Sequence, residues 1–284
     1  MSKATWRTLA ISLCLSLGGA LSSATFAQAQ PPQGRPAPGS QNPTLPSPVS
    51  ETRMGMWRGR PVTYQVINGR NIYQGDIILE NVQPTPQAGG AHPASVGLVD
   101  SNYLWPVVNG VAQIPYVIDP ASTNPNLPTA ISIYNATFAG VIQLIPRTTQ
   151  ANYIDINLNP NIVNNGVCEA TEGDAHQGEQ FVTGAGNCTV ATILHEFGHV
   201  TGVWHEQSRT DASTYVTFNE ANVIKGSIGN FLPAVDNDQQ NLGFYDYASI
   251  MEYPAFSFDR NGAPPTRLDS SRYAAFQFGR LFRC

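Results

Sequence analysis

The sequence His195-Glu196-Phe197-Gly198-His199, followed by Gly202 and His205, decides the fold and the chemistry expected of this chain. On a helix, residues four apart lie on the same face, so the imidazoles of His195 and His199 can converge on one metal ion. Gly202 lets the helix end in a left-handed conformation, and the chain then turns to bring in His205 as a third ligand. Three nitrogen ligands leave a fourth position for water, which is typical of catalytic zinc.

Glu196 lies one residue after the first of these histidines. Its carboxylate can reach the open side of the metal and take a proton from the water without being a ligand. A single histidine on a helix is usually structural, but three of the chain's five histidines fall within 11 positions at ligand spacing. A degenerate protein that binds zinc without cleaving is the better alternative, and the presence of Glu196 weakens it. The other histidines, His92 and His176, are interpreted as surface residues.

Length and composition fit a globular protein. The chain has 284 residues, 42% of them hydrophobic and 12% charged, with a formal net charge of -5. This length can bury a substantial core in one large domain or two modest ones. No basic run is present in the sequence, so we expect no nucleic-acid partner.

The N-terminus is typical of a secretory signal peptide over residues 1–29. Lys3 and Arg7 precede a largely apolar stretch at positions 9–21, and Ala27-Gln28-Ala29 is a suitable cleavage site. A membrane anchor is the alternative, but a bilayer span needs about 20 apolar residues. A lipoprotein anchored through Cys14 is a weaker alternative, because no small-residue cleavage site surrounds it. We therefore expect a secreted protein, extracellular or periplasmic, with no membrane association after signal removal.

Residues 30–95 are interpreted as a propeptide. Positions 30–50 are rich in Pro, Gln, Ser and Gly, and such a segment cannot offset the entropy of folding by burying apolar surface. Positions 52–84 form a short ordered segment, with a strand at 62–67, the turn signal Asn68-Gly69 and apolar residues at 77–79. A second loose stretch covers 83–93. Two loose stretches that flank a short ordered segment suggest that it is cut away.

The main domain is expected over residues 96–284. Hydrophobic patterns predict strands at 114–118 and 153–158 and helices at 128–141 and 188–201, with a loop over 159–186. The predicted class is α+β, with a mixed sheet and two long helices. Cys168, Cys188 and Cys284 remain after signal removal. In an oxidising compartment we expect a Cys168–Cys188 disulfide, which leaves Cys284 odd.

The extended zinc motif with a downstream Met is typical of metzincins. Within them, the sequence from His195 to Glu206 resembles the astacin family, in which Glu follows the third His. The likeness covers roughly residues 96–257 and extends to these further segments: Tyr103-Leu104-Trp105-Pro106, Ile114-Pro115-Tyr116-Val117-Ile118, Ile145-Pro146-Arg147-Thr148-Thr149, Gln207-Ser208-Arg209, Asp211, Tyr215-Val216, Tyr245-Asp246-Tyr247 and Ser249-Ile250-Met251-Glu252-Tyr253.

The resemblance implies a metzincin-like fold, with a mixed twisted sheet, two long helices and an active-site cleft between two subdomains. It implies one zinc ion held by His195, His199 and His205, with Glu196 as general base. Met251 would form the turn below the metal. Tyr253 would leave the zinc to donate its hydroxyl to the oxyanion, which is a sound way to stabilise developing negative charge. A buried aromatic residue with a satisfied hydroxyl is the alternative for Tyr253.

The resemblance also implies roles for other residues. Cys168 and Cys188 match a family disulfide, and Glu206 would have a structural role near the new N-terminus. Tyr73-Gln74-Gly75-Asp76 is similar to the family's propeptide motif, aromatic-x-Gly-Asp, whose Asp binds the zinc. An anionic carboxylate is a competent fourth ligand, and Gly75 lets the backbone enter the cleft. By the same resemblance, the propeptide would be cleaved from the main domain near Ser95 or Val96.

Three features depart from the family pattern. Val141 stands where a cysteine is usual, which would leave Cys284 without its expected partner. Glu252 replaces the usual His between Met251 and Tyr253. The chain also ends about 31 residues after Tyr253, so we expect a shortened or altered C-terminus.

Together these observations predict a secreted zinc endopeptidase of a bacterial type, made as a latent precursor. Its expected partners are a protein or peptide substrate and an activating protease. The alternative is a non-catalytic zinc-binding protein.

Overall fold

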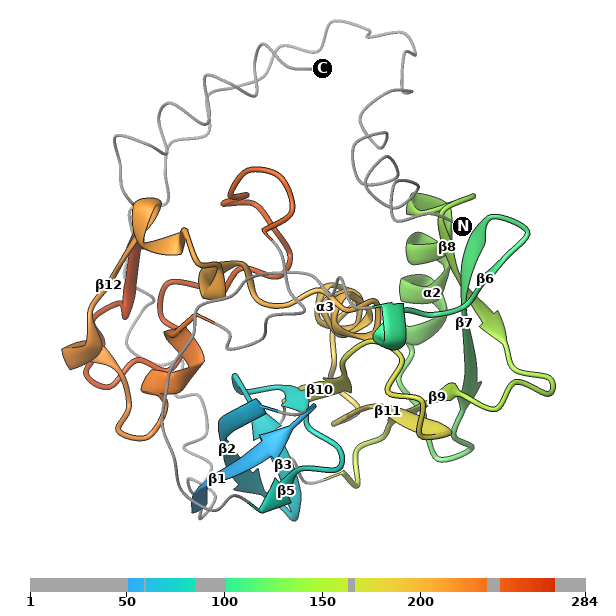
Figure 1. Ribbon diagram of the computed structural model, residues 1–284, viewed down its shortest axis with the longest axis horizontal. Helices are drawn as coiled ribbons and strands as arrows, with labels where there is room; N and C mark the ends of the chain where they lie inside the picture. Colours follow the sequence, from blue (N-terminus) through green and yellow to red (C-terminus); the bar gives the residue numbers. More distant parts are fainter. Residues whose placement is uncertain (1–50, 59, 85–100, 163–166, 234–240, 269–284) are drawn as a thin grey trace, which may run out of the picture.

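The computed structural model describes residues 51–58, 60–84, 101–162, 167–233 and 241–268 (Figure 1). The predicted signal peptide, the leader at 30–50, most of the second loose stretch, the maturation site, His92 and Cys284 lie outside these residues. Among the described residues, none of the helices combines the length and apolar character that a bilayer span requires.

One mixed sheet of eleven strands dominates the structure. Its strands are β1 (Glu51–Trp57), β2 (Arg60–Ile67), β3 (Arg70–Tyr73), β4 (Ile77–Ile78), β5 (Gln83–Pro84), β6 (Val107–Val108), β7 (Val111–Ile118), β8 (Ile142–Pro146), β9 (Tyr153–Leu158), β10 (Cys168–Thr171) and β11 (Glu179–Gly184). The order is β5-β1-β2-β3-β4-β10-β11-β9-β7-β6, and β8 pairs with β7. The β7–β8, β7–β9, β9–β11 and β4–β10 pairs are parallel, which confirms the predicted mixed sheet.

The other elements among the described residues are two α-helices, several short 3₁₀ helices and a separate antiparallel sheet of two strands. They are η2 (Ser101–Tyr103), α2 (Leu127–Thr137), α3 (Val190–Val200), η3 (Glu206–Ser208), η4 (Ala212–Thr214), β12 (Val216–Phe218), η5 (Glu220–Asn222), η6 (Ile228–Phe231) and β13 (Thr266–Leu268). Figure 1 shows α3 near the centre, with α2 on one side and the segment around β12 on the other.

The prediction of a loop over residues 159–186 was wrong, because β10 and β11 lie within it. Asn and Gly surround these strands, and β10 contains Glu and Thr without a clear apolar alternation. Its four residues are nevertheless all buried by neighbouring strands and by α3. The helix predicted at 128–141 ends four residues early. Phe138 caps it, and Gly140 adopts a φ of +77° that turns the chain toward β8.

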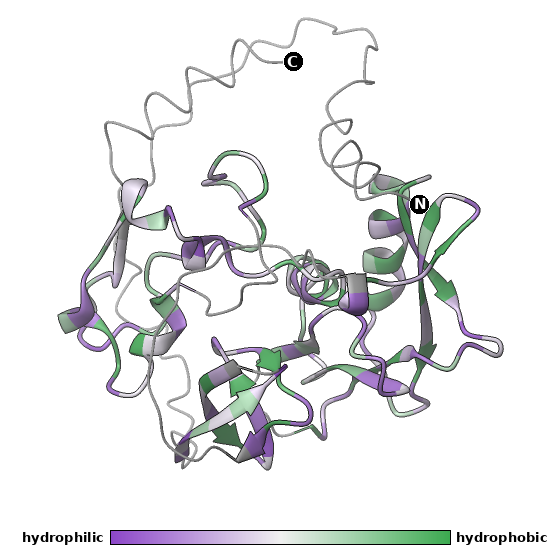
Figure 2. Ribbon diagram, viewed as in Figure 1, coloured by the Kyte–Doolittle hydropathy of each residue, from purple (hydrophilic) through white to green (hydrophobic). Residues whose placement is uncertain are grey.

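The main core lies between the sheet and the two helices. Ile114, Ile154 and Ile156 of the sheet are fully buried together with Phe197 of α3. Tyr134 of α2 packs edge-on against Phe197, with their ring centroids 5.6 Å apart. Figure 2 shows hydrophobic stretches, coloured green, along α2, whose buried residues are Leu127, Ala130 and Tyr134. Burial of these residues fixes α3, and with it the first two histidines, against the sheet.

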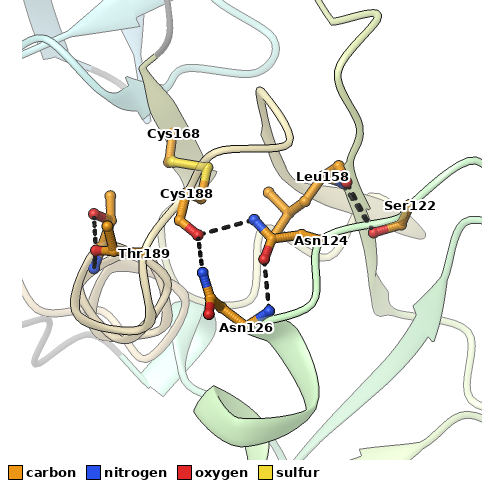
Figure 3. Close-up of a disulfide and its surroundings, with 8 residues drawn as sticks. Ser122, Asn124, Asn126, Leu158, Cys168, Cys188 and Thr189 are labelled. Carbon is orange, nitrogen blue, oxygen red and sulfur yellow. Dashed lines mark hydrogen bonds between the residues drawn. A yellow bond between two sulfur atoms is a disulfide. The ribbon is translucent and has the colours of Figure 1, made fainter.

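The predicted disulfide joins Cys168 of β10 to Cys188, which precedes α3 (Figure 3). The carbonyl oxygen of Cys188 accepts hydrogen bonds from the side-chain amides of Asn124 and Asn126, at 2.9 and 3.0 Å. These contacts tie the start of α2 to the start of α3. The disulfide therefore holds the helix that carries the zinc motif against strand β10.

Replacing both Cys168 and Cys188 by serine should lower the free energy of unfolding by about 3 kcal/mol, because the open chain gains the entropy of a loop of about 20 residues. Guanidinium denaturation of the full chain measures this change. Cys284→Ser is the control, since it leaves this disulfide intact. Equal unfolding midpoints for all three proteins would contradict the expectation.

Residues 51–84, which we call the N-terminal segment, add strands β1 to β5 to the sheet next to β10. Figure 1 shows these strands as a layer below α3. The segment has a small core of its own that contains Trp57, Tyr64, Tyr73 and Ile77, together with Trp204 from the other part of the chain. Trp204 packs edge-on against Trp57 and Tyr73, with ring centroids 6.0 and 5.4 Å away. The N-terminal segment thus packs directly beside His205.

Candidate metal centre

Helix α3 covers Val190–Val200, so it begins two residues later and ends one residue earlier than the predicted range of 188–201. Thr189 is the N-cap, and its side-chain oxygen accepts a hydrogen bond from the backbone N–H of Thr192 at 3.1 Å. At the other end, Gly202 has a φ of +88° and donates to the carbonyl of His199, while Val203 N–H donates to that of Gly198. This pair of bonds is a Schellman motif, which requires the left-handed glycine. It turns the chain so that His205 comes back beside the helix.

The three predicted ligands converge on one point. His195 Nε2 lies 3.2 Å from both His199 Nε2 and His205 Nε2. His199 and His205 are fully buried. A carboxylate from the N-terminal segment completes the group, because the Asp76 oxygens lie 3.4, 3.7 and 3.2 Å from Nε2 of His195, His199 and His205. The four ligand atoms all lie within 4.8 Å of one another.

Each imidazole is oriented by a hydrogen bond at its other nitrogen. His195 Nδ1 donates to the carbonyl of Ile250 and His199 Nδ1 to that of Val203, both at 2.8 Å. His205 Nδ1 contacts Oε1 of Gln74 at 3.2 Å. A neutral imidazole that donates from Nδ1 has its lone pair on Nε2. When all three imidazoles are neutral, as metal binding requires, three Nε2 lone pairs therefore point at the same place.

This donor set fits zinc. Tetrahedral zinc with Zn–N distances of about 2.0–2.1 Å separates its ligand atoms by about 3.3 Å, and the distances between the nitrogens and the carboxylate are close to that value. Asp76 Oδ1, although buried, accepts no hydrogen bond among the described residues. Converging lone pairs and an unbonded buried carboxylate oxygen need a cation between them.

Burial and Asp76 control the charges of the cluster. Burial lowers the pKa of His205 to about 4 and also lowers that of His199. Burial likewise disfavours the charged form of His195, but the hydrogen bond and charge of Asp76 outweigh it and raise its pKa to about 9. Burial would raise the pKa of Asp76, but His205 and the other two imidazoles hold it well below its ordinary value. The centre is thus a carboxylate among imidazoles that attracts positive charge.

Glu196 lies beside the cluster without belonging to it. It is 1% exposed, and its Oε2 has no hydrogen-bond partner among the described residues. Burial, followed by the nearby charge of Asp76, raises the pKa of its carboxyl well above the ordinary value. Such a carboxyl is poised to accept a proton from a neighbouring group.

Met251 packs directly under α3, and a glycine makes room for it. A Cβ added at Gly198 would overlap the Met251 Sδ atom and lie 3.1 Å from its Cε. The Met251 carbonyl also accepts a hydrogen bond from Glu206 N–H at 2.9 Å, and the preceding carbonyl holds His195. The turn around Met251 therefore contacts both parts of the chain that carry histidines.

Replacing Gly198 by Ala should lower the thermal unfolding midpoint of the zinc-loaded full chain, because an extra methyl group in this packed contact costs about 1–3 kcal/mol. Gly229→Ala is the matched control, since nothing lies within 4 Å of an added Cβ there. Gly198→Ala combined with Met251→Ala should recover part of the loss. Equal midpoints for Gly198→Ala and Gly229→Ala would contradict this account of the turn.

Tyr253 is 7% exposed, and its ring lies 4.4 Å from that of His205, centroid to centroid. Its hydroxyl donates a short hydrogen bond to the backbone carbonyl of Gln74. Burial raises the pKa of the hydroxyl well above its ordinary value, so it is a neutral donor. The hydroxyl is satisfied, as the alternative interpretation requires, but its acceptor belongs to the N-terminal segment.

Gln74 is a residue that the sequence did not single out. Besides its contacts with His205 and Tyr253, its Nε2 donates to the Leu232 carbonyl at 3.4 Å. It is 1% exposed and has a φ of +47°, and Gly75 follows with a φ of +88°. Added to Gly75, a Cβ would lie 2.7 Å from Phe258 Cζ. This close approach is consistent with the expected role of Gly75, which is to let the backbone enter the cleft. In the sequence alone, a polar residue before Gly-Asp gives no indication that it contacts the metal centre.

The remaining residues of interest lie around the centre. Glu206 Oε1 accepts hydrogen bonds from Asp246 N–H at 2.9 Å and from Arg209 at 3.3 Å. Glu252 is turned toward Tyr245, whose hydroxyl donates to its Oε2 at 2.6 Å. Burial raises the pKa of Glu252 to about 7. His176 contacts Asn152 and Asp174 and has a half-exposed side chain, as expected of a surface residue.

Comparisons with known proteins find relatives of this chain. The chain is 29% identical over 233 residues to meprin A subunit beta of Rattus norvegicus, covering 76% of this chain and 30% of that protein. It is 27% identical over 200 residues to astacin-like metalloprotease toxin 1 of Loxosceles intermedia, covering 69% of each. The chain thus spans less than a third of the meprin subunit.

Its structure is similar to that of high choriolytic enzyme 1, a hatching enzyme zinc-protease from Oryzias latipes. The TM-score is 0.52 and the identity 28%, over 62% of this chain and 86% of that one. The peptidase family described as astacin matches residues 100–280. Since this match covers more than half of the chain, the protein belongs to the astacin family of metalloendopeptidases.

Proposed function

We propose that this protein is a secreted zinc endopeptidase that is synthesised as a latent precursor. The observation that carries the proposal is the convergence of His195, His199 and His205 through Nε2, with each Nδ1 held by an oxygen acceptor. These three residues would hold one zinc ion per chain. The zinc would supply a Lewis acid that polarises a peptide carbonyl and lowers the pKa of water to about 7.

Glu196 would act as the general base. It is buried beside the histidines and has an oxygen free of hydrogen bonds from the described residues. It would take the proton of the attacking water and deliver it to the nitrogen of the leaving amine, since one group can serve as base and then as acid. Tyr253 would leave the metal site and donate its hydroxyl to the oxyanion, where negative charge develops.

The N-terminal segment would keep the precursor latent in two ways. Asp76 would be the fourth zinc ligand and so displace water. Gln74 would engage Tyr253 through its carbonyl and His205 through its side chain, which removes the hydroxyl donor from the site. Removal of this segment would free both groups together. The space that it leaves between the sheet and the segment around β12 would form the substrate cleft.

The domain limits follow from this proposal. Residues 1–29 would be the signal peptide, 30–95 the propeptide and 96–284 the peptidase domain. An activating protease would cut near Ser95 or Val96, and the product would act outside the cell or in the periplasm on a protein or peptide substrate. The relatives reported above are animal proteins, and the bacterial type of precursor stays a prediction.

Chelation separates an enzyme from a zinc-binding protein without activity. The full chain, processed near residue 95, should cleave a denatured protein, lose this activity in a strong chelator and regain it when zinc is added. Inactivity of a processed protein that is fully loaded with zinc would favour the non-catalytic alternative.

A further inference from the structure

The N-terminal segment covers one edge of strand β10, and this edge leads to the metal centre. Strand β4 pairs with β10 in parallel, with Ile77 opposite Ala170. The backbone N–H of Ala170 also donates to the carbonyl of Asp76 at 3.1 Å. An extended chain on this edge therefore reaches the three histidines. Extended peptides commonly bind by adding a strand to such an edge.

The carboxylates of Glu169, on β10, and of Glu172, just after it, face arginines of the N-terminal segment. Arg70 Nη1 donates to Glu169 Oε2 at 2.8 Å. Arg58 Nη2 donates to the backbone carbonyl of Glu172 at 2.8 Å, and its Nη1 lies 3.6 Å from the Glu172 carboxylate. The side chains of Glu169 and Glu172 are only 3% and 0% exposed. Carboxylates this deeply buried favour a positively charged neighbour.

The contact with Arg58 is shaped for a guanidinium group. The Arg58 Cζ atom lies 3.8 Å from the ring centroid of Tyr103 and 4.2 Å from that of Trp57. Tyr103 and Glu172 belong to the peptidase part and would remain after the N-terminal segment is removed. A planar cation stacked on an aromatic ring beside a carboxylate is a favourable arrangement for arginine.

We propose that, after removal of the N-terminal segment, this edge of β10 selects peptides with basic side chains, which take the places of Arg70 and Arg58. This inference rests on the proposed function. By continuation of the register, Glu169 lies beside Asp76, so a basic residue should be preferred close to the peptide bond that is cut. Glu172 lies three residues after Glu169, just past the end of β10, which is about 10 Å away in an extended chain. A second basic residue about three positions away should add to the preference.

Pairs of quenched fluorescent peptides test this inference. Each pair differs only in one arginine and its neutral isostere citrulline, and the enzyme is the zinc-loaded full chain after processing. We expect kcat/KM to be at least about tenfold higher for the arginine peptide, as for a charge-assisted hydrogen bond. In Glu169→Gln the ratio should fall toward one. Glu179→Gln is the matched control, because this exposed Glu lies on β11 and contacts Tyr153 instead. Equal cleavage of both peptides by the unsubstituted enzyme would overturn the inference.

A binding measurement separates failure of this inference from failure of the proposed function. If neither peptide is cleaved, the proposed function fails. Fluorescence anisotropy of the processed, zinc-loaded Glu196→Gln variant then still tests the edge, since the arginine peptide should bind at least about tenfold more tightly than the citrulline peptide. Added salt should weaken this preference. Equal affinities would refute the proposed selection even if the protein is an active peptidase.

Discussion

Replacing Glu196 by Gln should lower kcat for peptide hydrolysis by about 10²–10⁴-fold and leave zinc bound. The amide keeps the size of the carboxylate but cannot accept a proton from water. Glu196 is not among the four groups whose ligand atoms converge, so the metal content should not change. The measurement is the steady-state rate of the processed, zinc-loaded protein, together with its zinc content.

Glu179→Gln is the control for this variant, because it makes the same chemical change at an exposed position on β11. It should retain full activity. If Glu196→Gln also retained full activity, Glu196 would not be the base. If it lost its zinc, loss of activity would report on the metal site instead, and the assignment of Glu196 as a residue outside the coordination shell would be wrong.

Replacing Asp76 by Ala should make the uncleaved precursor active. The carboxylate lies 3.2–3.7 Å from Nε2 of the three histidines in its closest contacts, and the variant would leave the fourth position open to water. The measurement compares hydrolysis of a short peptide by the precursor before and after processing. We expect the precursor of the variant to reach a substantial share of the processed rate, and the unsubstituted precursor to be almost inert.

Glu51→Ala is the control in the same segment. Glu51 is exposed and pairs with Arg53 on β1, so its loss should leave the precursor latent. A precursor of Asp76→Ala that stays inert while its processed form is active would count against the carboxylate as the latch. In that case the Gln74 contacts with Tyr253 and His205 would be the stronger barrier.

The sequence predicts the metal centre better than the sheet. Ligand spacing on a helix, the left-handed glycine and the third histidine follow from local rules. In the structure His195, His199 and His205 lie together and Gly202 has a positive φ, while their role as zinc ligands stays a prediction. Strand β10 depends instead on neighbours distant in the sequence. Its partner β4 lies about 90 residues earlier, and no local alternation of apolar residues reveals the pairing.

Local sequence patterns also could not predict the contacts between the N-terminal segment and the rest of the chain. The aromatic-x-Gly-Asp pattern indicated Asp76, which the structure brings to the histidines. It gave no reason to select Gln74, whose contacts depend on where His205 and Tyr253 lie. The contact of Arg70 with Glu169 likewise joins residues 99 positions apart. Such contacts become visible only when the topology is known.

Zinc content is the measurement that tests the central claim most directly. The purified full chain, dialysed against metal-free buffer, should retain about one zinc ion per chain by elemental analysis. His199→Ala should lose most of it, because two nitrogens and a carboxylate remain where four ligands converge. His176→Ala, which removes a surface histidine, should bind zinc as the unsubstituted chain does. Zinc absent from the unsubstituted chain, or retained in full by His199→Ala, would contradict the account.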